Sequence, residues 1–419
     1  MNIVEKKIYD LVKSKPWIKN IIRNIYQSFY DILPRKKEFF KNQIEYKEGY
    51  FFGFHDVNPF SVNNNKVLSH KLLHDNLIIP KFGEKIDIGY FKFRNEKFED
   101  FIKVEESTAW NFHKGARLQW VGLESIIFNT SIKNNLVSKL VNIKSNESKV
   151  FDFSIDSISK DGTLASSFSY ERLNKFMPGY GYDGAIDDGF LNEKAPSKTG
   201  IFIYSLKNEN LIKMISLEQL LRLDKNELNI SKFNHYVTHS EFSKDGRYLS
   251  FLHRWVGDDI MERKSKLLIY DMNEDKIIET NTSGMVSHYV WNEKNEILAY
   301  CSINNIDGYY IISTPDFKKT NHIAPNYLNS DGHQTFICNE KFITDTYPDK
   351  FRMSKLKLVN ISNNNVELLA SIYSPKEFQT KDFKNHIACD LHPRVSFDRS
   401  LVCFDAVRNH NRSLCIMSI

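Results

Sequence analysis

The sequence predicts an all-β fold: a seven-bladed β-propeller preceded by an N-terminal basic amphipathic α-helical extension. Three observations support this prediction. A strand–turn–strand phrase returns seven times along the chain, which is the mark of a repeat architecture. The strands are rich in Ile, Val, Phe and Tyr, as a half-buried sheet requires. With 419 residues, the chain is too long for most single compact cores.

Each repeat consists of a first strand, a polar turn, a second strand and a further strand. Asp-Gly and Asn-rich steps suit the turns because they tolerate positive φ. One such sheet cannot bury both of its faces, whereas sheets stacked radially can. A pair of β-sandwiches is the alternative, but it would not need one phrase seven times. The phrases are VNPFSVNNNKVLSHKL, RLQWVGLESIIFNT, IDSISKDGTLASSFSY, HSEFSKDGRYLSFLHRW, HYVWNEKNEILAYCS, QTFICNEKFITDT and RVSFDRSLVCFDA.

Residues 1–42 differ from residues 45–419, which we assign to the propeller. In residues 1–42, apolar residues recur three or four positions apart, which predicts a helix that is interrupted at Pro16 and ends at Pro34. Lys and Arg surround this apolar stripe, so the segment could make a peripheral contact with an anionic membrane. Alternatively, this helix packs its apolar face on the propeller and exposes its basic face to solvent, and the sequence favours neither arrangement. A second helical segment at 216–223 is expected as an insertion between blades three and four.

Composition narrows the classes of partner. The 57 basic residues nearly balance the 52 acidic ones, so we expect no nucleic-acid partner. Five Cys without a CxxC pair favour reduced thiols. We see neither a run of about 18 apolar residues nor a signal peptide. We therefore expect a cytoplasmic protein whose N-terminal extension lies at the inner face of the membrane. We also expect a monomer. PGYGYDG lacks the spacing and the Lys of a phosphate loop, so no nucleotide cofactor is expected.

Histidines recur at one position of the repeat. Equivalent positions in radially arranged blades converge at one end of the channel, where loops build a site. Several neutral imidazoles favour one divalent metal, Mn or Zn, and Gln334 or Cys389 could complete its ligands. A structural role, tying a turn to the next blade, is the alternative. The four histidines that precede the first strands of blades four to seven are His239, His288, His333 and His392.

Further polar and aromatic residues flank the inner strands and are candidates for the same site. They are His55, His113, Arg117, Tyr170, Arg172, Tyr180, Tyr182, Arg254, Tyr347 and Arg394.

The phrases HSEFSKDGRYLSFLHRW, DGHQTF…TDTY and CDLHPRVSFD resemble those of β-propeller polysaccharide lyases. The similarity is to oligogalacturonate lyases and, more loosely, to ulvan lyases. FHDVNPFS and PGYGYDG look like an uncharacterised branch near them, linked to surface-polysaccharide loci. The resemblance covers most of residues 45–419 as scattered short motifs. It implies eliminative cleavage of a uronate-containing glycan.

For the metal, the resemblance to oligogalacturonate lyases implies an Mn held by three His and a Gln, with another His as the base. His288, His333 and His392 match the ligand layout. His239 looks like the base. The family's final His-Pro-His is replaced here by His392-Pro393-Arg394, so a cation stands where the family has a ligand.

In the ulvan-type enzymes, His, Tyr and Arg side chains carry the reaction, and His55, Tyr170 and Arg172 could take these parts. Elimination requires that the substrate carboxylate be neutralised by a metal or by Arg, so that the neighbouring proton becomes acidic. Arg254, Arg394 and Arg172 are the candidate clamps. We expect the remaining candidates to bind substrate: His113, Arg117, Tyr180, Tyr182 and Tyr347.

Two other functions stay open at this stage. One is a non-catalytic propeller that binds glycan or acts as a scaffold. The other is a glycosyltransferase-like enzyme of capsule or O-antigen biosynthesis.

Overall fold

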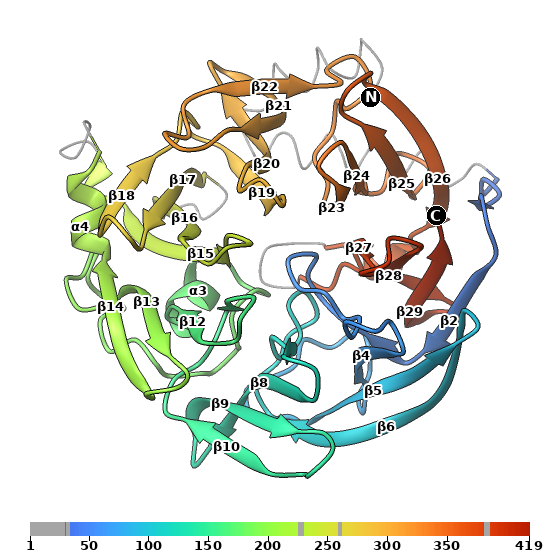
Figure 1. Cartoon of the computed structure of the whole chain (residues 1–419), viewed down its shortest axis with the longest axis horizontal. Coiled ribbons are helices and arrows are strands. Elements are labelled where there is room, and N and C mark those ends of the chain that lie inside the picture. Colours follow the sequence, from blue (N-terminus) through green and yellow to red (C-terminus); the bar gives the residue numbers. More distant parts are fainter. Residues whose placement is uncertain (1–29, 31–33, 225–229, 259–261, 381–385) are drawn as a thin grey trace.

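The computed structural model describes Tyr30 and residues 34–224, 230–258, 262–380 and 386–419. Seven antiparallel sheets stand around a central axis (Figure 1). Six of them have four strands and one has five. The predicted all-β, seven-bladed propeller is therefore confirmed. The described part also contains two α-helices, α3 (Tyr170–Phe176) and α4 (Leu217–Arg222), and a short 3-10 helix, η1 (Lys376–Phe378).

The first four blades follow chain order from the channel outward (Figure 1). Blade one consists of β3 (Tyr50–Phe51), β4 (Lys66–Lys71), β5 (Ile86–Arg94) and β6 (Lys97–Ser107). Blade two consists of β7 (Gln119–Val121), β8 (Ser125–Ile132), β9 (Asn135–Asn142) and β10 (Ser148–Phe151). Blade three consists of β11 (Ser157–Ile158), β12 (Leu164–Ser167), β13 (Gly200–Ser205) and β14 (Asn210–Ser216). Blade four consists of β15 (Asn234–Phe242), β16 (Tyr248–Val256), β17 (Lys264–Asp271) and β18 (Lys276–Glu279).

Blade five follows the same order, whereas blades six and seven each include an outer strand from the start of the described chain. Blade five consists of β19 (Val286–Trp291), β20 (Ile297–Ile303), β21 (Ile306–Ile312) and β22 (Thr320–Ile323). Blade six consists of β23 (Gln334–Cys338), β24 (Lys341–Thr344), β25 (Met353–Asn360), β26 (Asn365–Tyr373) and β1 (Phe39–Phe40). Blade seven consists of β27 (Arg394–Val395), β28 (Leu401–Arg408), β29 (Asn411–Ser418) and β2 (Ile44–Glu48).

The ring closes through strands from opposite ends of the chain. β2 pairs with β29 in an antiparallel register in which Tyr46 lies opposite Cys415. β1 pairs with β26, and Glu38 binds Arg408 of blade seven at 2.7 Å and the backbone N–H of Tyr373 of blade six at 3.0 Å. The boundary therefore differs from the predicted one, because Phe39 and Phe40 belong to a propeller sheet.

The repeated turn has a common chemical basis in three blades. A Ser hydroxyl donates to the Asp two residues later at 2.6 Å, and the residue after the Asp has positive φ, which tightens the turn. The Ser–Asp pairs are Ser159–Asp161, Ser243–Asp245 and Ser396–Asp398.

The blades hold together through apolar side chains packed between neighbouring sheets. Leu252 and Leu267 of blade four share one buried cluster with Trp291 and Ile297 of blade five. The indole N–H of Trp291 also donates to the Ser250 hydroxyl at 2.8 Å, which satisfies a buried donor. Burial of this kind is the main favourable contribution to folding.

The helical insertion at 216–223 is present as α4, between β14 and β15. It begins with a capping box, in which the Ser216 hydroxyl and the Gln219 side chain each accept from the other's backbone N–H. The predicted N-terminal helix falls almost entirely on residues 1–29 and 31–33, outside the described residues. No helix in the described ranges is long and apolar enough to cross a bilayer.

Removal of β2 should open the ring. Deleting residues 1–48 exposes the edge of β29, and at a net value of about 1 kcal/mol per backbone hydrogen bond we expect a loss of a few kcal/mol in unfolding free energy. Urea and thermal unfolding measure this loss. Deletion of residues 1–36 is the control, since it leaves β1 and β2 in place. Equal stability of the two truncations would contradict closure by β2.

Candidate functional site

Imidazoles from five blades converge around the ring of Phe54. The rings of His288 and His333 are 4.1 Å apart, and those of His333 and His392 are 4.2 Å apart. Radial stacking therefore brings the repeated histidines together, as the sequence predicts. The distances from the centre of the Phe54 ring are 4.6 Å to His55, 4.9 Å to His239, 5.0 Å to His392, and 5.8 Å to both His288 and His333.

Local backbone irregularities direct these side chains. The register of β15 against β16 shifts between Thr238 and Glu241, and His239 within this bulge has a φ of 53°. His392 likewise has a φ of 46°. Bulges re-aim side chains, and left-handed non-glycine residues cluster at functional sites.

Burial keeps most of the cluster neutral. Desolvation, reinforced by neighbouring positive charges, holds the pKa values of His55, His113, His239 and His392 well below the ordinary value. His333 is different. Burial acts against its charge, but the Asp345 carboxylate, 3.0 Å from its Nδ1, outweighs burial and raises the pKa. The site therefore contains one imidazole that favours the cation among several that favour the neutral form.

Carboxylates fix two of the rings. Asp345 contacts Nδ1 of His333 and also accepts the backbone N–H of His392 at 3.0 Å. Asp331 lies 3.3 Å from Nδ1 of His288 and accepts the Ser287 hydroxyl at 2.5 Å. A carboxylate on one ring nitrogen orients the other nitrogen for a ligand.

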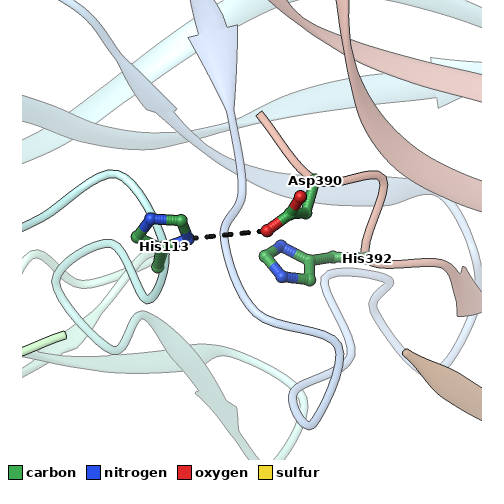
Figure 2. Close-up of side chains that lie close together, drawn as sticks. All are labelled: His113, Asp390 and His392. Carbon is green, nitrogen blue, oxygen red and sulfur yellow. Dashed lines mark ion pairs between the residues drawn. The ribbon is translucent and has the colours of Figure 1, made fainter. Parts of the chain in front are cut away.

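A second group offers a candidate metal site. His113, from the loop before β7, lies beside Asp390 and His392, from the segment before β27 (Figure 2). One ligand atom from each residue lies within 4.8 Å of the others. Nε2 of His392 and Oδ2 of Asp390 are buried and make no hydrogen bond with any residue the structure describes. Burial raises the pKa of Asp390 to about 6, which indicates a carboxylate that lacks a close positive partner.

The donor set therefore fits a divalent ion. His113 pairs with His386 through Nε2, which leaves Nδ1, 3.9 Å from the Asp390 carboxylate, as the free nitrogen. Neutral imidazoles with a carboxylate suit Mn or Zn. This set overlaps the predicted ligands only at His392.

Two other predicted ligands are placed less favourably. Cys389 packs against Phe378 and Val407, and burial raises the pKa of its thiol to about 12, so the thiolate that binds metals is disfavoured. Gln334 donates its amide to the backbone carbonyls of blade five, one of them that of His288 at 2.8 Å. Its Oε1 is buried without a hydrogen bond to a described residue.

A pocket of about 240 Å³ opens beside the imidazoles. Of the predicted residues, His288, Tyr180, Tyr347 and Arg254 line it. The Tyr180 ring stacks on His113 at 4.7 Å, which connects the pocket to the candidate metal group. Tyr347 packs its edge against His333 at 5.6 Å.

Arg254 is placed to meet an anion. Its guanidinium donates to the sulfur of Met177 at 3.1 Å and to the carbonyl oxygens of Val286 and Ser287 at 3.2 and 3.4 Å. No ion pair joins it to a carboxylate in the described part of the chain. Arg263 lines the same pocket.

Other predicted site residues serve the framework instead. Arg117 makes a bidentate pair with Asp56 at 2.9 and 3.0 Å and binds the backbone oxygen of Asp156. Arg172 is engaged by Asp188 at 2.6 Å and by three backbone carbonyls. Their donors are occupied, so neither is free for substrate.

Arg394, Tyr170 and Tyr182 are also held within the framework. Arg394 lies 3.3 Å from Asp405 and donates to the backbone of Gly53. Tyr170 and Tyr182 stack on each other at 4.4 Å in the core, and the Tyr170 hydroxyl donates to a backbone carbonyl at 2.7 Å. Sequence position alone could not separate these anchors from residues that face the pocket.

Sequence reasoning assigned no role to several members of the site. Asp331, Asp345 and Asp390 each stand one to three residues from a predicted His or Tyr, and that spacing was the available signal. His386 and Arg263 have no repeat position to mark them. Lys114 is fully buried against Asp156 at 2.6 Å, with its ammonium 5.6 Å from the Phe54 ring.

Comparison with solved structures finds this architecture in oligogalacturonate lyases. One in complex with manganese is 11% identical, with a TM-score of 0.61 over 92% of this chain and 98% of that chain. Another, from Vibrio parahaemolyticus, is 10% identical, with a TM-score of 0.57 over 92% and 99%. No family model and no curated protein matches the sequence. At these identities the likeness shows the fold.

The distinction between framework and pocket arginines can be tested by matched substitutions. Arg117→Met leaves the Asp56 carboxylate without its partner and removes one of the two cations beside Asp156, and we expect a loss of about 3–5 kcal/mol in unfolding free energy. Arg254→Met strands no carboxylate and should cost about 1 kcal/mol or less. Urea denaturation at neutral pH measures both. Similar losses would show that Arg254 is also a framework residue.

Proposed function

We propose that this chain is a lyase that cleaves a uronate-containing oligo- or polysaccharide by β-elimination. The observation that carries the proposal is a pocket lined by Arg254 and by two imidazoles, His288 and His386, whose pKa values burial lowers. The guanidinium can bind a carboxylate, and a neutral imidazole can accept a proton. The fold shared with oligogalacturonate lyases supports the same reading.

The reaction removes the C5 proton and breaks the C4–O4 bond, so that a C4–C5 double bond forms and O4 leaves with a proton. Arg254 would hold the substrate carboxylate and make the C5 proton more acidic. His239 is the proposed base, because its imidazole is neutral and its Nε2 makes no hydrogen bond with a described residue.

Tyr180 is the proposed acid for the leaving oxygen. Its ring lies 6.0 Å from that of His239 and lines the pocket. Burial raises its pKa, so the phenol retains its proton until a more basic alkoxide develops. Tyr347 lines the same pocket, and burial also raises its pKa well above the ordinary value.

A divalent ion bound by His113, Asp390 and His392 would supply further positive charge for the substrate carboxylate. His386 would hold the His113 ring with Nδ1 toward such an ion. Mn is the metal of the manganese-bound lyase with the same fold, and Zn suits the same donors.

A non-catalytic propeller that binds acidic glycan is the second candidate, since Arg254 in the pocket favours binding with or without cleavage. A glycosyltransferase-like role in surface-polysaccharide synthesis stays a prediction of the sequence. The same is true of a cytoplasmic location, of a membrane contact through residues 1–42, and of a monomeric state.

Incubation with oligogalacturonides should generate the ultraviolet absorbance of an unsaturated uronate. We expect His239→Gln to reduce this rate at least about 100-fold, because general base catalysis contributes 10²–10⁴-fold. His322→Gln, on the outer strand β22, is the matched control and should retain activity. Binding of the oligosaccharide without product would support the glycan-binding candidate instead.

Asp390→Asn should weaken Mn²⁺ binding by at least about 10-fold, because it removes the charge of the proposed carboxylate ligand. Calorimetric titration of metal-free protein measures the change. Asp331→Asn is the control, as Asp331 lies outside the group formed by His113, Asp390 and His392. Equal Mn²⁺ affinities of the wild type and Asp390→Asn would contradict a metal site at Asp390.

A further inference from the structure

A second, very small cavity lies against Phe54. It has a volume of about 10 Å³, close to the space that one buried water needs. It is lined by His55, Asp56, His239 and Glu241, among others. The proposed elimination uses His239 as its base but gives Glu241 no role.

Two polar atoms of these lining residues have no hydrogen-bond partner among the described residues. They are Nε2 of His239 and Oε2 of Glu241. The side chains belong to residues that are only 4% and 7% exposed. Buried polar atoms in native proteins are nearly always paired with protein or with ordered water. A cavity of this size, lined by the residues that carry these two unpaired atoms, suits one water.

The surroundings of Glu241 favour the carboxylic acid. Lys244, from its own turn, is the nearest cation, with its ammonium 3.8 Å from Oε1. Asp56 faces the cavity from the loop after β3, but its charge is matched by the bidentate pair with Arg117. Burial raises the pKa of Glu241 to about 8, against the opposing effect of Lys244. At neutral pH Glu241 is therefore mostly protonated.

The other nitrogen of His239 is already engaged. Nδ1 lies 2.8 Å from the hydroxyl of Thr238, which can either donate or accept. The backbone oxygen of His239 accepts from the Tyr289 hydroxyl, so the peptide is held in place. The neutral ring is thus free to exist in either tautomer, and the group on Nε2 decides between them.

We propose that Glu241 sets which nitrogen of His239 carries the proton, acting through one water in this cavity. As an acid, Glu241 donates to the water, the water donates to Nε2, and the proton of the imidazole stays on Nδ1, where it is donated to Thr238. When Glu241 loses its proton to solvent, the water turns to donate to the carboxylate. It then accepts from Nε2–H, the imidazole proton moves from Nδ1 to Nε2 by exchange through water, and the Thr238 hydroxyl becomes the donor to Nδ1.

The inference stands apart from the proposed lyase activity, because a tautomer is a property of the free protein. It matters to any reaction at His239, since only the nitrogen with the lone pair can accept a proton. Glu241 is in this sense a positioning residue for His239. His55 also lines the cavity, but its Nδ1 is taken by the backbone oxygen of Gln334 at 2.8 Å.

Nitrogen NMR of histidine-labelled full-length protein tests the proposal, with His239→Gln identifying the signals of His239. In the wild type we expect the lone pair on Nε2 at pH 6 and a change of tautomer as the pH rises through about 8. Glu241→Gln should keep the low-pH tautomer throughout, because its amide can still donate to the water. A wild-type tautomer that does not change, or a change that persists in Glu241→Gln, would overturn the proposal.

Lys244→Met provides a second arm that leaves Glu241 in place. Removing the neighbouring positive charge should raise the pKa of Glu241 and move the tautomer change to higher pH. An unmoved transition would count against Glu241 as its origin. A crystal structure at high resolution should show a water between His239 and Glu241, and a dry cavity would rule out the coupling.

Stability gives an independent readout. A group whose pKa rises on folding contributes stability below its unfolded value, and this contribution is lost as pH increases through the folded value. The wild type should therefore lose stability from about pH 5 to above pH 8 relative to Glu241→Gln, in which no carboxylate titrates. Parallel stability curves for the two proteins would contradict the buried titration.

Discussion

The closed ring is the constraint on which the rest of the molecule depends. Each blade exposes apolar faces that only the neighbouring blades can cover, and pairing of β2 with β29 joins blade seven to a strand from the start of the chain. Once the circle is closed, the inner strands face one another around the central axis (Figure 1). Residues at equivalent positions of the repeat then meet, although they are separated by tens of residues in sequence.

The close packing of these histidines determines their protonation states. Several imidazoles share a buried space in which each would repel another cation, so most of them are neutral and His333 is the exception, beside Asp345. Neutral rings can accept a proton or bind a metal, whereas imidazolium can do neither. The neutrality therefore follows from the architecture, and the proposed chemistry depends on that neutrality.

The buried arginines differ in whether a carboxylate pairs with them. Arg117 and Arg394 are bound to carboxylates within the framework, where they hold loops from different blades together. Arg254 instead meets the carbonyl oxygens of blade five and the open pocket. Arg254 thus carries its charge where an acidic ligand can reach it, whereas Arg117 and Arg394 are paired with carboxylates. The same reasoning gives Glu241, a buried acid beside an unpaired His239 nitrogen, a function separate from the framework.

The sequence by itself determined the repeat, the number of blades, the helical insertion at α4 and the convergence of the repeated histidines. These features depend on local periodicity and turn chemistry, which are written in short phrases. Only the tertiary structure decided the finer points: the outer strands β1 and β2, the carboxylates at Asp345 and Asp390, and the division of arginines between framework and pocket. The physical reason is that hydrogen-bond partners and burial depend on contacts across blades, as between Asp345 and His392. No local pattern in the chain records such contacts.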